Sequence, residues 1–404
     1  MTEQVNTPEL RFPEFKDEWR EFNLKDISTK KSKKNKNKLY NETFTNSAEY
    51  GIVSQKDYFD KEISNVRNLS NYYIVDPDDF VYNPRISRLA PVGPINRNKL
   101  NRIGVMSPLY TVFSTKLSIK SFLEYYFKTT KWHKFMKLNG DSGARSDRFT
   151  IKQSLFVKMP IVLPSEQEQE KIGKFFSKLD QQIELEEKKL ELLEQQKRGY
   201  MQKIFSQELR FKDENGNSYP DWSIKKIEDI SKVNKGFTPN TKNDEYWDEL
   251  KENWLSIAGM TQKYLYKGNK GITKKGASKH AKVDKDTLIM SFKLTLGKLA
   301  IVKEPIYTNE AICHFIWKES NVNTEYMYYY LNSINIITFG AQAVKGVTLN
   351  NDSINSIIVK LPVIQEQNKI AYFFNKLDKL IEKQSSKVEL LKQRKQGLLQ
   401  KMFV

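Results

Sequence analysis

The sequence predicts an α+β protein with two globular domains, each followed by a long helix, and the two helices paired as an antiparallel coiled coil. Three observations support this prediction. A segment of about 38 residues occurs twice at a constant offset of 198 residues. The apolar residues of both copies follow a seven-residue period. The regions before the copies mix short strand-like runs with helical stretches, which is typical of α+β domains.

The repeat aligns without a gap, and roughly half of its positions are identical. The matching segments are EQEKI at 168–172 and EQNKI at 366–370, FFSKLD at 175–180 and FFNKLD at 373–378, and GYMQKIF at 199–205 and GLLQKMF at 397–403. Neither copy contains an internal proline, so both can be continuous helices of roughly 57 Å.

Apolar residues recur in both copies at alternating steps of four and three. They are Ile172, Phe176, Leu179, Ile183, Leu190, Leu193, Tyr200 and Ile204 in the first, and Ile370, Phe374, Leu377, Ile381, Val388, Leu391, Leu398 and Met402 in the second. This period is typical of helices that pack along a seam. Two positions of this period are polar in each copy, at matched places: Glu186 and Lys197 in the first and Gln384 and Lys395 in the second. Such polar seam positions predict a fixed register.

The repeat divides the chain into alternating domains and helices. The predicted parts are an N-terminal extension at 1–16, a first domain at 17–163, a first helix at 164–208, a second domain at 209–363 and a second helix at 364–404. Strand-like runs lie at 79–82, 109–113, 287–292 and 311–317. Weaker matches, such as Leu10-Arg11-Phe12 with Leu209-Arg210-Phe211, indicate that the two domains share one plan although their sequences differ.

The chain carries a formal charge of +18 and has a pI of about 9.4. The first long helix is nearly neutral and the second carries about +5, so most of the excess belongs to the domains. Nucleic acid is therefore the first candidate partner. The single cysteine excludes an internal disulfide and fits a cytoplasmic location. No apolar run is long enough to predict a membrane span.

Several basic and amide side chains are candidates for DNA contact. They are Lys30, Lys31, Lys33, Lys34, Asn83, Arg85, Arg88, Arg145 and Arg148 in the first domain, and Lys293, Lys298 and Lys345 in the second. Lysines suit phosphate contact, whereas arginine binds guanine edges and asparagine binds adenine edges through paired hydrogen bonds. The alternative is that each basic residue is an ordinary surface charge, and that residues 30–38 form a solvated loop.

Catalytic motifs are weak in this sequence. Cys313-His314 lacks partners at metal-ligand spacing, and strand alternation would turn one of the two residues toward the core. Asn83-Pro84 lacks the second proline and the aromatic residue of an adenine methyltransferase motif. No phosphate-binding loop is present. A loose nuclease pattern of Asp221, Glu249 and Lys251 leaves a metal-dependent nuclease as one alternative function.

Two dissimilar basic domains, each followed by a near-identical helix that opens with Glu-Gln-x-Lys-Ile, resemble the specificity subunit of type I restriction-modification systems. The resemblance covers essentially the whole chain. Its most specific parts are residues 160–180 and 362–378, together with residues 222–239 of the second domain, which end in Lys235-Gly236-Phe237-Thr238-Pro239.

The resemblance implies two target-recognition domains, each reading one half of a split, asymmetric site in double-stranded DNA. It implies that the paired helices hold the domains apart and dock two methyltransferase (M) subunits, which use S-adenosylmethionine to methylate adenine N6. Restriction (R) subunits using ATP and Mg²⁺ would join for cleavage. The chain itself would be non-catalytic and would bind no cofactor. A coiled-coil organiser that binds nucleic acid without sequence preference remains a second alternative.

Overall fold

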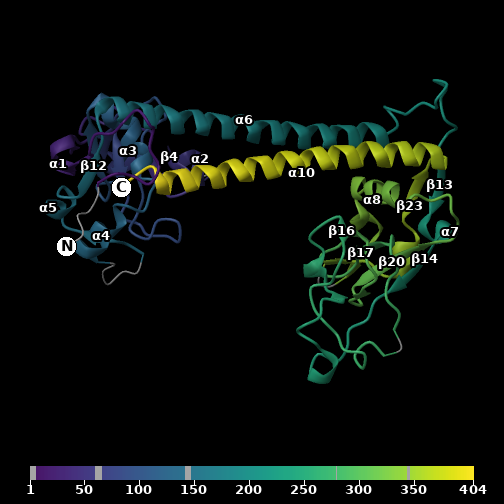
Figure 1. Ribbon diagram of the computed structural model, residues 1–404. Coiled ribbons are helices and arrows are strands. Elements are labelled where there is room, and N and C mark those ends of the chain that lie inside the picture. Colours follow the sequence, from purple (N-terminus) through teal and green to yellow (C-terminus); the bar gives the residue numbers. More distant parts are fainter. Residues whose placement is uncertain (1–5, 60–65, 142–146, 279, 344–345) are drawn as a thin grey trace. The chain divides into compact units, whose positions relative to one another are not determined.

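The computed structural model describes residues 6–59, 66–141, 147–278, 280–343 and 346–404 (Figure 1). The chain divides into two compact units, one of residues 1–187 with 386–404 and the other of residues 188–385. Each unit therefore combines one domain with the beginning of the long helix that follows it and with the end of the other long helix. The two division points lie 198 residues apart, which is the offset of the sequence repeat.

The two repeat copies form long helices, α6 (Glu166–Phe205) and α10 (Ile364–Lys401). Ion pairs join them: Lys395–Asp180 and Lys392–Glu187 in the first unit, and Lys197–Asp378 in the second. From Asp180 to Lys197 along α6, the paired residues of α10 run in the opposite direction, from Lys395 to Asp378. The helices therefore pair antiparallel. Phe176 and Phe374, which are apolar residues of the seven-residue seam, are fully buried. The predicted helical pairing is confirmed.

The first domain contains a four-stranded antiparallel sheet in the order β2-β9-β6-β7. These strands are β2 (Ser28–Lys31), β9 (Thr111–Thr115), β6 (Phe80–Tyr82) and β7 (Ile95–Arg97). The other strands are β1 (Arg20–Asn23), β3 (Phe44–Ser47), β4 (Gly51–Ser54), β5 (Tyr73–Val75), β8 (Gly104–Met106), β10 (Gly140–Asp141), β11 (Thr150–Ile151) and β12 (Pro160–Leu163). The helices are α1 (Leu24–Ile27), α2 (Gln55–Phe59), α3 (Lys120–Tyr126), α4 (His133–Asn139) and α5 (Gln153–Phe156).

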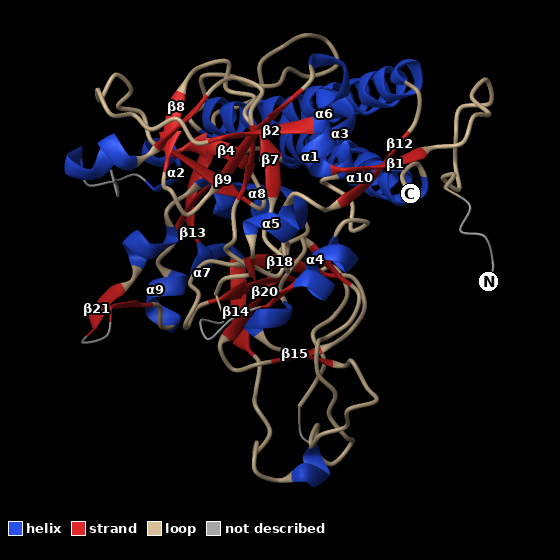
Figure 2. Ribbon diagram, turned by 90° about the vertical axis from the view of Figure 1, so that its left-hand side faces the viewer, coloured by secondary structure: helices blue, strands red, loops and turns tan. Residues whose placement is uncertain are grey.

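The second domain contains a five-stranded sheet in the order β14-β20-β17-β18-β16, of which β14, β18 and β20 are labelled in Figure 2. These strands are β14 (Ser231–Lys235), β20 (Ile312–Trp317), β17 (Leu288–Ser291), β18 (Leu299–Val302) and β16 (Tyr264–Leu265). The other elements are β13 (Ser223–Lys226), β15 (Trp254–Leu255), β19 (Tyr307–Thr308), β21 (Ala341–Ala343), β22 (Gly346–Thr348), β23 (Ile358–Leu361), α7 (Ile227–Ile230), α8 (Thr324–Ser333) and α9 (Asn351–Asn355).

The two domains are built on one plan, as the sequence predicts. Strands β2, β9, β6 and β7 correspond in order and pairing to β14, β20, β17 and β18. Outside the sheets, β1 pairs antiparallel with β12, and β13 pairs antiparallel with β23. In both domains the second strand of that pair leads directly into the long helix. The second domain adds β16, which lies parallel to β18 at the sheet edge.

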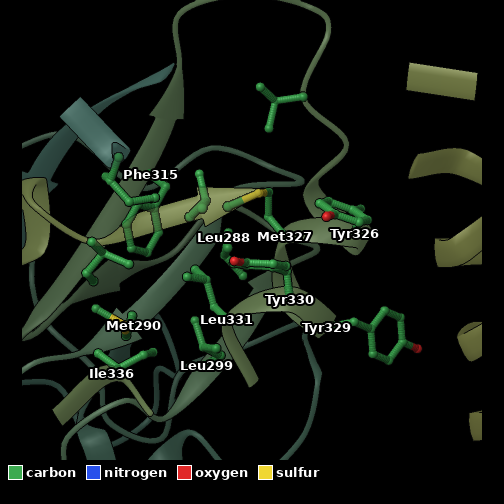
Figure 3. Packing of buried hydrophobic residues seen from close by; sticks show 14 of the residues in the cluster. Leu288, Met290, Leu299, Phe315, Tyr326, Met327, Tyr329, Tyr330, Leu331 and Ile336 are labelled. Atoms are coloured by element: carbon green, nitrogen blue, oxygen red, sulfur yellow. The ribbon is translucent and has the colours of Figure 1, made fainter. Parts of the chain in front are cut away.

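The main core of each unit packs a helix of the domain against its sheet and both long helices. Figure 3 shows the packing of α8 against the sheet in the second unit, where Met327 and Tyr330 of α8 lie near Leu288. Aromatic residues from the ends of the long helices complete the cores. Phe205 at the end of α6 is buried in the second unit, and Phe403 beyond the end of α10 is buried in the first.

Strand β20 corrects one detail of the sequence analysis. Alternation predicts that one of Cys313 and His314 faces the core, but both are buried. The reason is that β20 is a central strand with apolar clusters on both faces, containing Phe315 on one side and Ile312 on the other. The Nε2 atom of His314 lies 2.6 Å from Thr308 Oγ1, and burial lowers the pKa of His314 to about 4.

Within the described part of the chain, no helix combines the length and apolar character that crossing a lipid bilayer requires.

Candidate nucleic-acid interface

The basic residues predicted in the first domain converge at one end of its sheet. Strand β2 ends at Lys31 opposite Val112, and β6 ends at Tyr82 opposite Thr111. Because Thr111 and Val112 are neighbours on β9, the chain leaves β2 and β6 at the same end. The loop after β2 contains Lys33 and Lys34, and the loop between β6 and β7 contains Asn83, Arg85 and Arg88.

The segment after α4 joins this end of the sheet. Arg85 and Arg148 form an antiparallel β-bridge, with hydrogen bonds from Ile86 N to Asp147 O of 3.0 Å and from Phe149 N to Pro84 O of 2.8 Å. Backbone pairing therefore holds two predicted arginines together although they are distant in sequence. Arg145 lies outside the described residues.

The arginines of this loop remain open to solvent. The Arg85 side chain is 70% exposed and Arg148 37% exposed, and both lie 3.9 Å from the carboxylate of Asp147. Pairs this long and this exposed contribute little to stability, so the guanidinium groups can exchange Asp147 for another anion. Arg88 is also exposed. These side chains have the freedom that phosphate or base contact requires.

Asn83 has a different environment from the one that the sequence suggests. Its side chain donates to Asn46 O at 2.8 Å and accepts from Arg85 N at 3.0 Å. Both polar ends of the amide are therefore used inside the domain. Asn83 fixes the start of the loop between β6 and β7, and its role in base contact stays a prediction.

The lysines after β2 also divide into two kinds. Lys30, Lys33 and Lys34 are exposed, whereas Lys31 binds Asp76 at 2.5 Å and Asp79 at 2.9 Å. Burial disfavours the charge of Lys31, but the hydrogen bonds to the two aspartates outweigh it and raise its pKa. For Asp79, which is more deeply buried, burial is the larger effect and raises its pKa. Lys31 is thus already paired within the domain.

The second domain repeats the arrangement at the corresponding end of its sheet. Strand β14 ends at Lys235 opposite Cys313, and β17 ends at Ser291 opposite the adjacent Ile312. The loop between β17 and β18, which corresponds to the loop between β6 and β7, contains the predicted Lys293 and Lys298. Lys345 lies outside the described residues.

Positive charge gathers around the β17–β18 loop. The ammonium groups of Lys235 and Lys293 lie 5.0 and 5.8 Å from the ring centroid of buried Phe292. No ion pair in the described residues includes Lys235, Lys293 or Lys298. Three lysines without an acidic partner make this end of the sheet attractive to a polyanion.

The Lys235–Pro239 motif packs closely against residues 308–312, which lead into β20. A Cβ atom on Gly236 would lie 2.1 Å from Thr308 O, so only glycine permits this approach of the two backbones. The neighbouring bonds hold the motif in place, with Phe237 N donating to Thr308 O at 2.8 Å and Asn309 Nδ2 donating to Thr238 Oγ1 at 2.8 Å. The motif is thus part of the support of the candidate interface.

A polar junction joins each domain to both long helices. In the first unit, Asp180 of α6 binds Lys395 of α10 and accepts from Tyr125 Oη of α3 at 2.9 Å. Burial works to raise the pKa of Asp180, but hydrogen bonding to Lys395 and the charge of Lys128 outweigh it, so the pKa lies below its usual range. The second unit repeats the junction with Asp378, Lys197 and Tyr329.

These junctions explain why the helix seam contains a lysine at matched positions, Lys197 and Lys395. The sequence predicts a fixed register from Lys197 and Lys395, but it does not reveal their partners. The signal that could have found them is the repeated FFxKLD segment, whose aspartates lie 198 residues apart, as do the two lysines. In the structure each lysine pairs with the aspartate of the other repeat copy.

A buried ion pair anchors the segment before each domain. Arg11 donates two hydrogen bonds of 2.7 Å to Glu168, whose side chain is fully buried. Arg210 donates to Glu366 at 3.2 and 2.8 Å in the matching place. The two arginines match in the sequence, but no sequence pattern revealed that they pair with the glutamates of the Glu-Gln-x-Lys-Ile segments.

The two ion pairs differ in one partner. Trp222 Nε1 donates to Glu366 at 3.0 Å, whereas the corresponding Nε1 of buried Trp19 has no hydrogen-bond partner. The Glu366 carboxylate therefore receives a third hydrogen bond that Glu168 lacks. A buried N–H group without a partner costs about 1–3 kcal/mol, so the Trp19 indole destabilises the first unit relative to its counterpart.

Each unit also has a groove where its first strand meets the beginning of a long helix. The grooves have volumes of about 790 Å³ in the first unit and about 520 Å³ in the second. Matched residues line them: Glu18 and Asp221, Asp26 and Asp229, Ile27 and Ile230, Leu163 and Leu361, Pro164 and Pro362, and Gln169 and Gln367. Two equivalent grooves can accept two copies of one partner.

The residues of the nuclease alternative have other contacts. Asp221 lies 3.7 Å from Arg210, and Lys251 binds Asp248 at 2.7 Å. The part of the chain that the structure describes contains no group of three histidine, cysteine, aspartate or glutamate side chains placed to hold a metal ion. No observation here favours metal-dependent cleavage.

The comparisons with known proteins agree with this architecture. A family model described as "Type I restriction modification DNA specificity domain" matches residues 16–195 and 219–391. The MjaIX specificity subunit of a type I restriction enzyme from Methanocaldococcus jannaschii is 29% identical over 209 residues, which are 50% of this chain and 48% of that protein. The MjaVIII specificity subunit from the same organism is 24% identical, over 73% of this chain and 70% of that protein. The chain thus aligns with about half the length of the first relative.

Solved structures show a similar fold. A chain from a study of complex assembly in a type I R-M system matches with a TM-score of 0.59 and 12% identity, over 95% of this chain and 97% of that one. The S subunit of a type I restriction-modification system from M. genitalium matches with a TM-score of 0.54 and 14% identity, over 98% and 99% of the two chains. At these identities the likeness concerns the fold alone.

Proposed function

The chain belongs to the family of type I restriction-modification DNA specificity proteins, and from this premise we propose that it is the sequence-reading subunit of such a complex. Each domain reads one half of a split, asymmetric site in double-stranded DNA. The chain itself catalyses no reaction. It directs partner subunits, which methylate adenine N6 or cleave the DNA.

One observation supports this proposal above the others. The basic loops of the two domains leave equivalent sheets at equivalent ends, on frameworks that pair strand for strand. The loops differ in sequence while the framework recurs. A protein that reads two different half-sites through one architecture requires this combination, because the framework positions the loops and the loop side chains select the bases.

The partners follow from the matched grooves and from the family. We propose that two methyltransferase subunits, each using S-adenosylmethionine, bind one at each groove. Restriction subunits that use ATP and Mg²⁺ join the complex for cleavage. A location in the cytoplasm, where the DNA and these partners are, belongs to the same proposal. Two acidic groove residues at matched positions, Glu18 and Asp221, are exposed and suit contact with a basic surface of the partner.

Co-expression with the methyltransferase subunits, followed by long-read detection of N6-methyladenine in host DNA, tests the reading function. We expect one split, asymmetric motif that appears only when this chain is present. Arg88→Ala should relax or abolish recognition of the half-site that the first domain reads. Lys298→Ala should do the same for the half-site that the second domain reads. Lys383→Ala changes an exposed lysine of α10 and should leave the motif intact. Loss of both halves from either single-domain variant would contradict separate reading.

Native mass spectrometry of the same complex tests the grooves. Glu18→Lys should remove one methyltransferase subunit and Asp221→Lys the other, because each reverses a charge at one groove. The double variant should retain neither. If both single variants keep two methyltransferase subunits, the grooves are not the docking sites.

A further inference from the structure

The loop between β17 and β18 carries an apolar side chain at its tip that the domain does not use. Leu294 is 95% exposed and has a positive φ of 64°. This left-handed conformation favours glycine and is unfavourable for leucine. The loop is nevertheless closely held, because Gly297 N donates to Ser291 O at 2.8 Å and Lys298 N donates to Ser291 Oγ at 3.1 Å. The structure therefore presents Leu294 to solvent in a fixed, unfavourable conformation.

The corresponding loop of the first domain presents a leucine too. Leu89 is 64% exposed and lies in a tight turn that is closed by Ser87 N to Ala90 O and Ala90 N to Ser87 O hydrogen bonds of 3.1 Å each. Arg88 precedes Leu89 as Lys293 precedes Leu294. A basic residue followed by an exposed leucine thus recurs at the tips of equivalent loops, in domains whose loops otherwise differ in length and sequence.

A single exposed leucine needs no explanation, since much of any protein surface is apolar. The recurrence at equivalent tips, the unfavourable backbone of Leu294 and the cationic neighbours together indicate a binding role. Lysine and arginine next to the tip favour the phosphates that flank a DNA groove. The leucine beside these residues would then reach the base edges, where the thymine C5-methyl group is the apolar feature of the major groove.

The width of the loop favours the major groove. Paired strands lie about 4.8 Å apart, and with their side chains a hairpin is roughly 10 Å wide. The major groove is about 12 Å wide and admits a two-stranded ribbon, whereas the minor groove is about 6 Å wide. A hairpin end such as the β17–β18 loop fits the first and not the second.

We propose that Leu294 and Leu89 are base-reading residues, each packing against a thymine methyl group in the major groove of its own half-site. This inference rests on the proposed function, because it requires that the two loops face DNA. It adds the residue in each domain that recognises an apolar group, beside the basic residues that contact phosphates and polar base edges.

The test uses the complex of the full chain with its methyltransferase subunits and duplexes that contain the methylated motif. Each thymine in the half-site of the second domain is replaced in turn by deoxyuridine, which lacks the methyl group. We expect one replacement to weaken binding of the unchanged protein about fivefold to tenfold. Leu294→Ala should weaken binding to the thymine duplex by a similar factor, and the replacement should then have no further effect. Leu89→Ala should behave likewise on the other half-site.

Two controls separate base contact from general effects. Leu250→Ala removes another leucine of the second domain, 97% exposed, and should bind every duplex as the unchanged protein does. A duplex without the motif should bind equally to the unchanged protein and to Leu294→Ala, because phosphate contacts do not involve the leucine.

The outcomes distinguish this inference from the proposed function. If the unchanged complex shows no preference for the motif, the proposed function fails. If it prefers the motif but no deoxyuridine replacement matters, or Leu294→Ala and the replacement weaken binding additively, the thymine contact is wrong. A leucine-dependent rise in 2-aminopurine fluorescence at one base step would also overturn it, since that signal indicates a wedge between bases.

Discussion

Removing Arg11 should destabilise its unit more than removing Arg210 destabilises the other, although the two arginines occupy matching positions. Breaking a buried ion pair typically costs about 3–5 kcal/mol, because the remaining charge is left without a partner. Arg11→Met leaves the fully buried Glu168 without either of its two strong hydrogen bonds. Arg210→Met leaves Glu366 with the bond from Trp222 Nε1 at 3.0 Å.

A hydrogen bond to a charged group contributes about 1.5–3 kcal/mol. We therefore expect a loss of about 4 kcal/mol for Arg11→Met and of about 2 kcal/mol for Arg210→Met. Hydrogen exchange followed by mass spectrometry measures the loss locally, from the opening free energies of amides at the beginning of α6 and of α10. Arg394→Met, at an exposed position of α10, should stay within about 0.5 kcal/mol of the unchanged protein.

The variants Arg11→Met and Glu168→Gln, alone and combined, form a double-mutant cycle. Because the double variant removes the unpaired charge, it should cost less than the sum of the two single changes by about 2 kcal/mol or more. Equal losses for the two arginine variants, or a larger loss for Arg210→Met, would refute the role assigned to Trp222. If the free-energy losses of the two single changes simply add in the double variant, the ion pair itself is refuted.

Three further predictions follow from the same contacts. Trp222→Phe should lower the opening free energy of its unit by about 1.5–3 kcal/mol more than Trp19→Phe does, measured by hydrogen exchange, because only Trp222 donates to a carboxylate. The folded-state pKa of Asp180 lies below its unfolded value, so its stabilising effect is full above pH ~4 and is lost as pH falls through the folded pKa. Acid unfolding of Asp180→Asn should therefore be less steep below pH ~4. Inserting one heptad in each long helix, after Glu187 and after Ser385, should lengthen the gap of the methylated motif and preserve both half-sites; an unchanged gap would contradict a spacer role for the helices.

The sequence predicted the long helices well because their signal is local and repeated. A seven-residue period over some 38 positions leaves little choice of structure, and the predicted spans of 164–208 and 364–404 contain the observed helices Glu166–Phe205 and Ile364–Lys401. The four strand-like runs also coincide with β6, β9, β17 and β20. These elements are marked by their own apolar residues.

The sheet order could not be predicted in the same way. Strands β14 and β20 are neighbours although about eighty residues separate them in the chain, and their pairing depends on which faces become buried together. For the same reason the sequence did not predict that Cys313 and His314, on opposite faces of β20, are both buried. A strand covered on both faces shows no alternation that a sequence pattern could reveal.

The candidate interface was predicted by residue type and not by geometry. Arg85 and Arg148 were both expected to contact DNA, but only the β-bridge brings them together. Lys31 and Asn83 were chosen by the same criterion, and their side chains bind Asp76 and Asn46 within the domain. Composition identifies a basic loop, whereas the partner of each side chain depends on distant parts of the chain.

The end of each long helix packs in the core of the domain that the other helix follows, and this leads to a last prediction. Phe403 belongs to the second repeat, yet its ring lies 5.0 Å from Phe122 and 5.9 Å from Phe176, in the core of the first unit. Phe205 belongs to the first repeat, yet its ring stacks 5.8 Å from Phe374 in the core of the second unit.

Neither domain can therefore complete its core from its own repeat. Phe→Ala changes in a core cost about 3–5 kcal/mol, so Phe403→Ala should lower the protection of α3 by that amount and Phe205→Ala that of α8. Hydrogen exchange of both helices in each variant measures the two effects together. If Phe403→Ala lowered only the protection of α8, each domain would complete its core with the helix that follows it. The packing of Phe403 in the core of the first unit would then be wrong. If Phe403→Ala weakens α3, the core of the first domain depends on a residue of the second repeat copy.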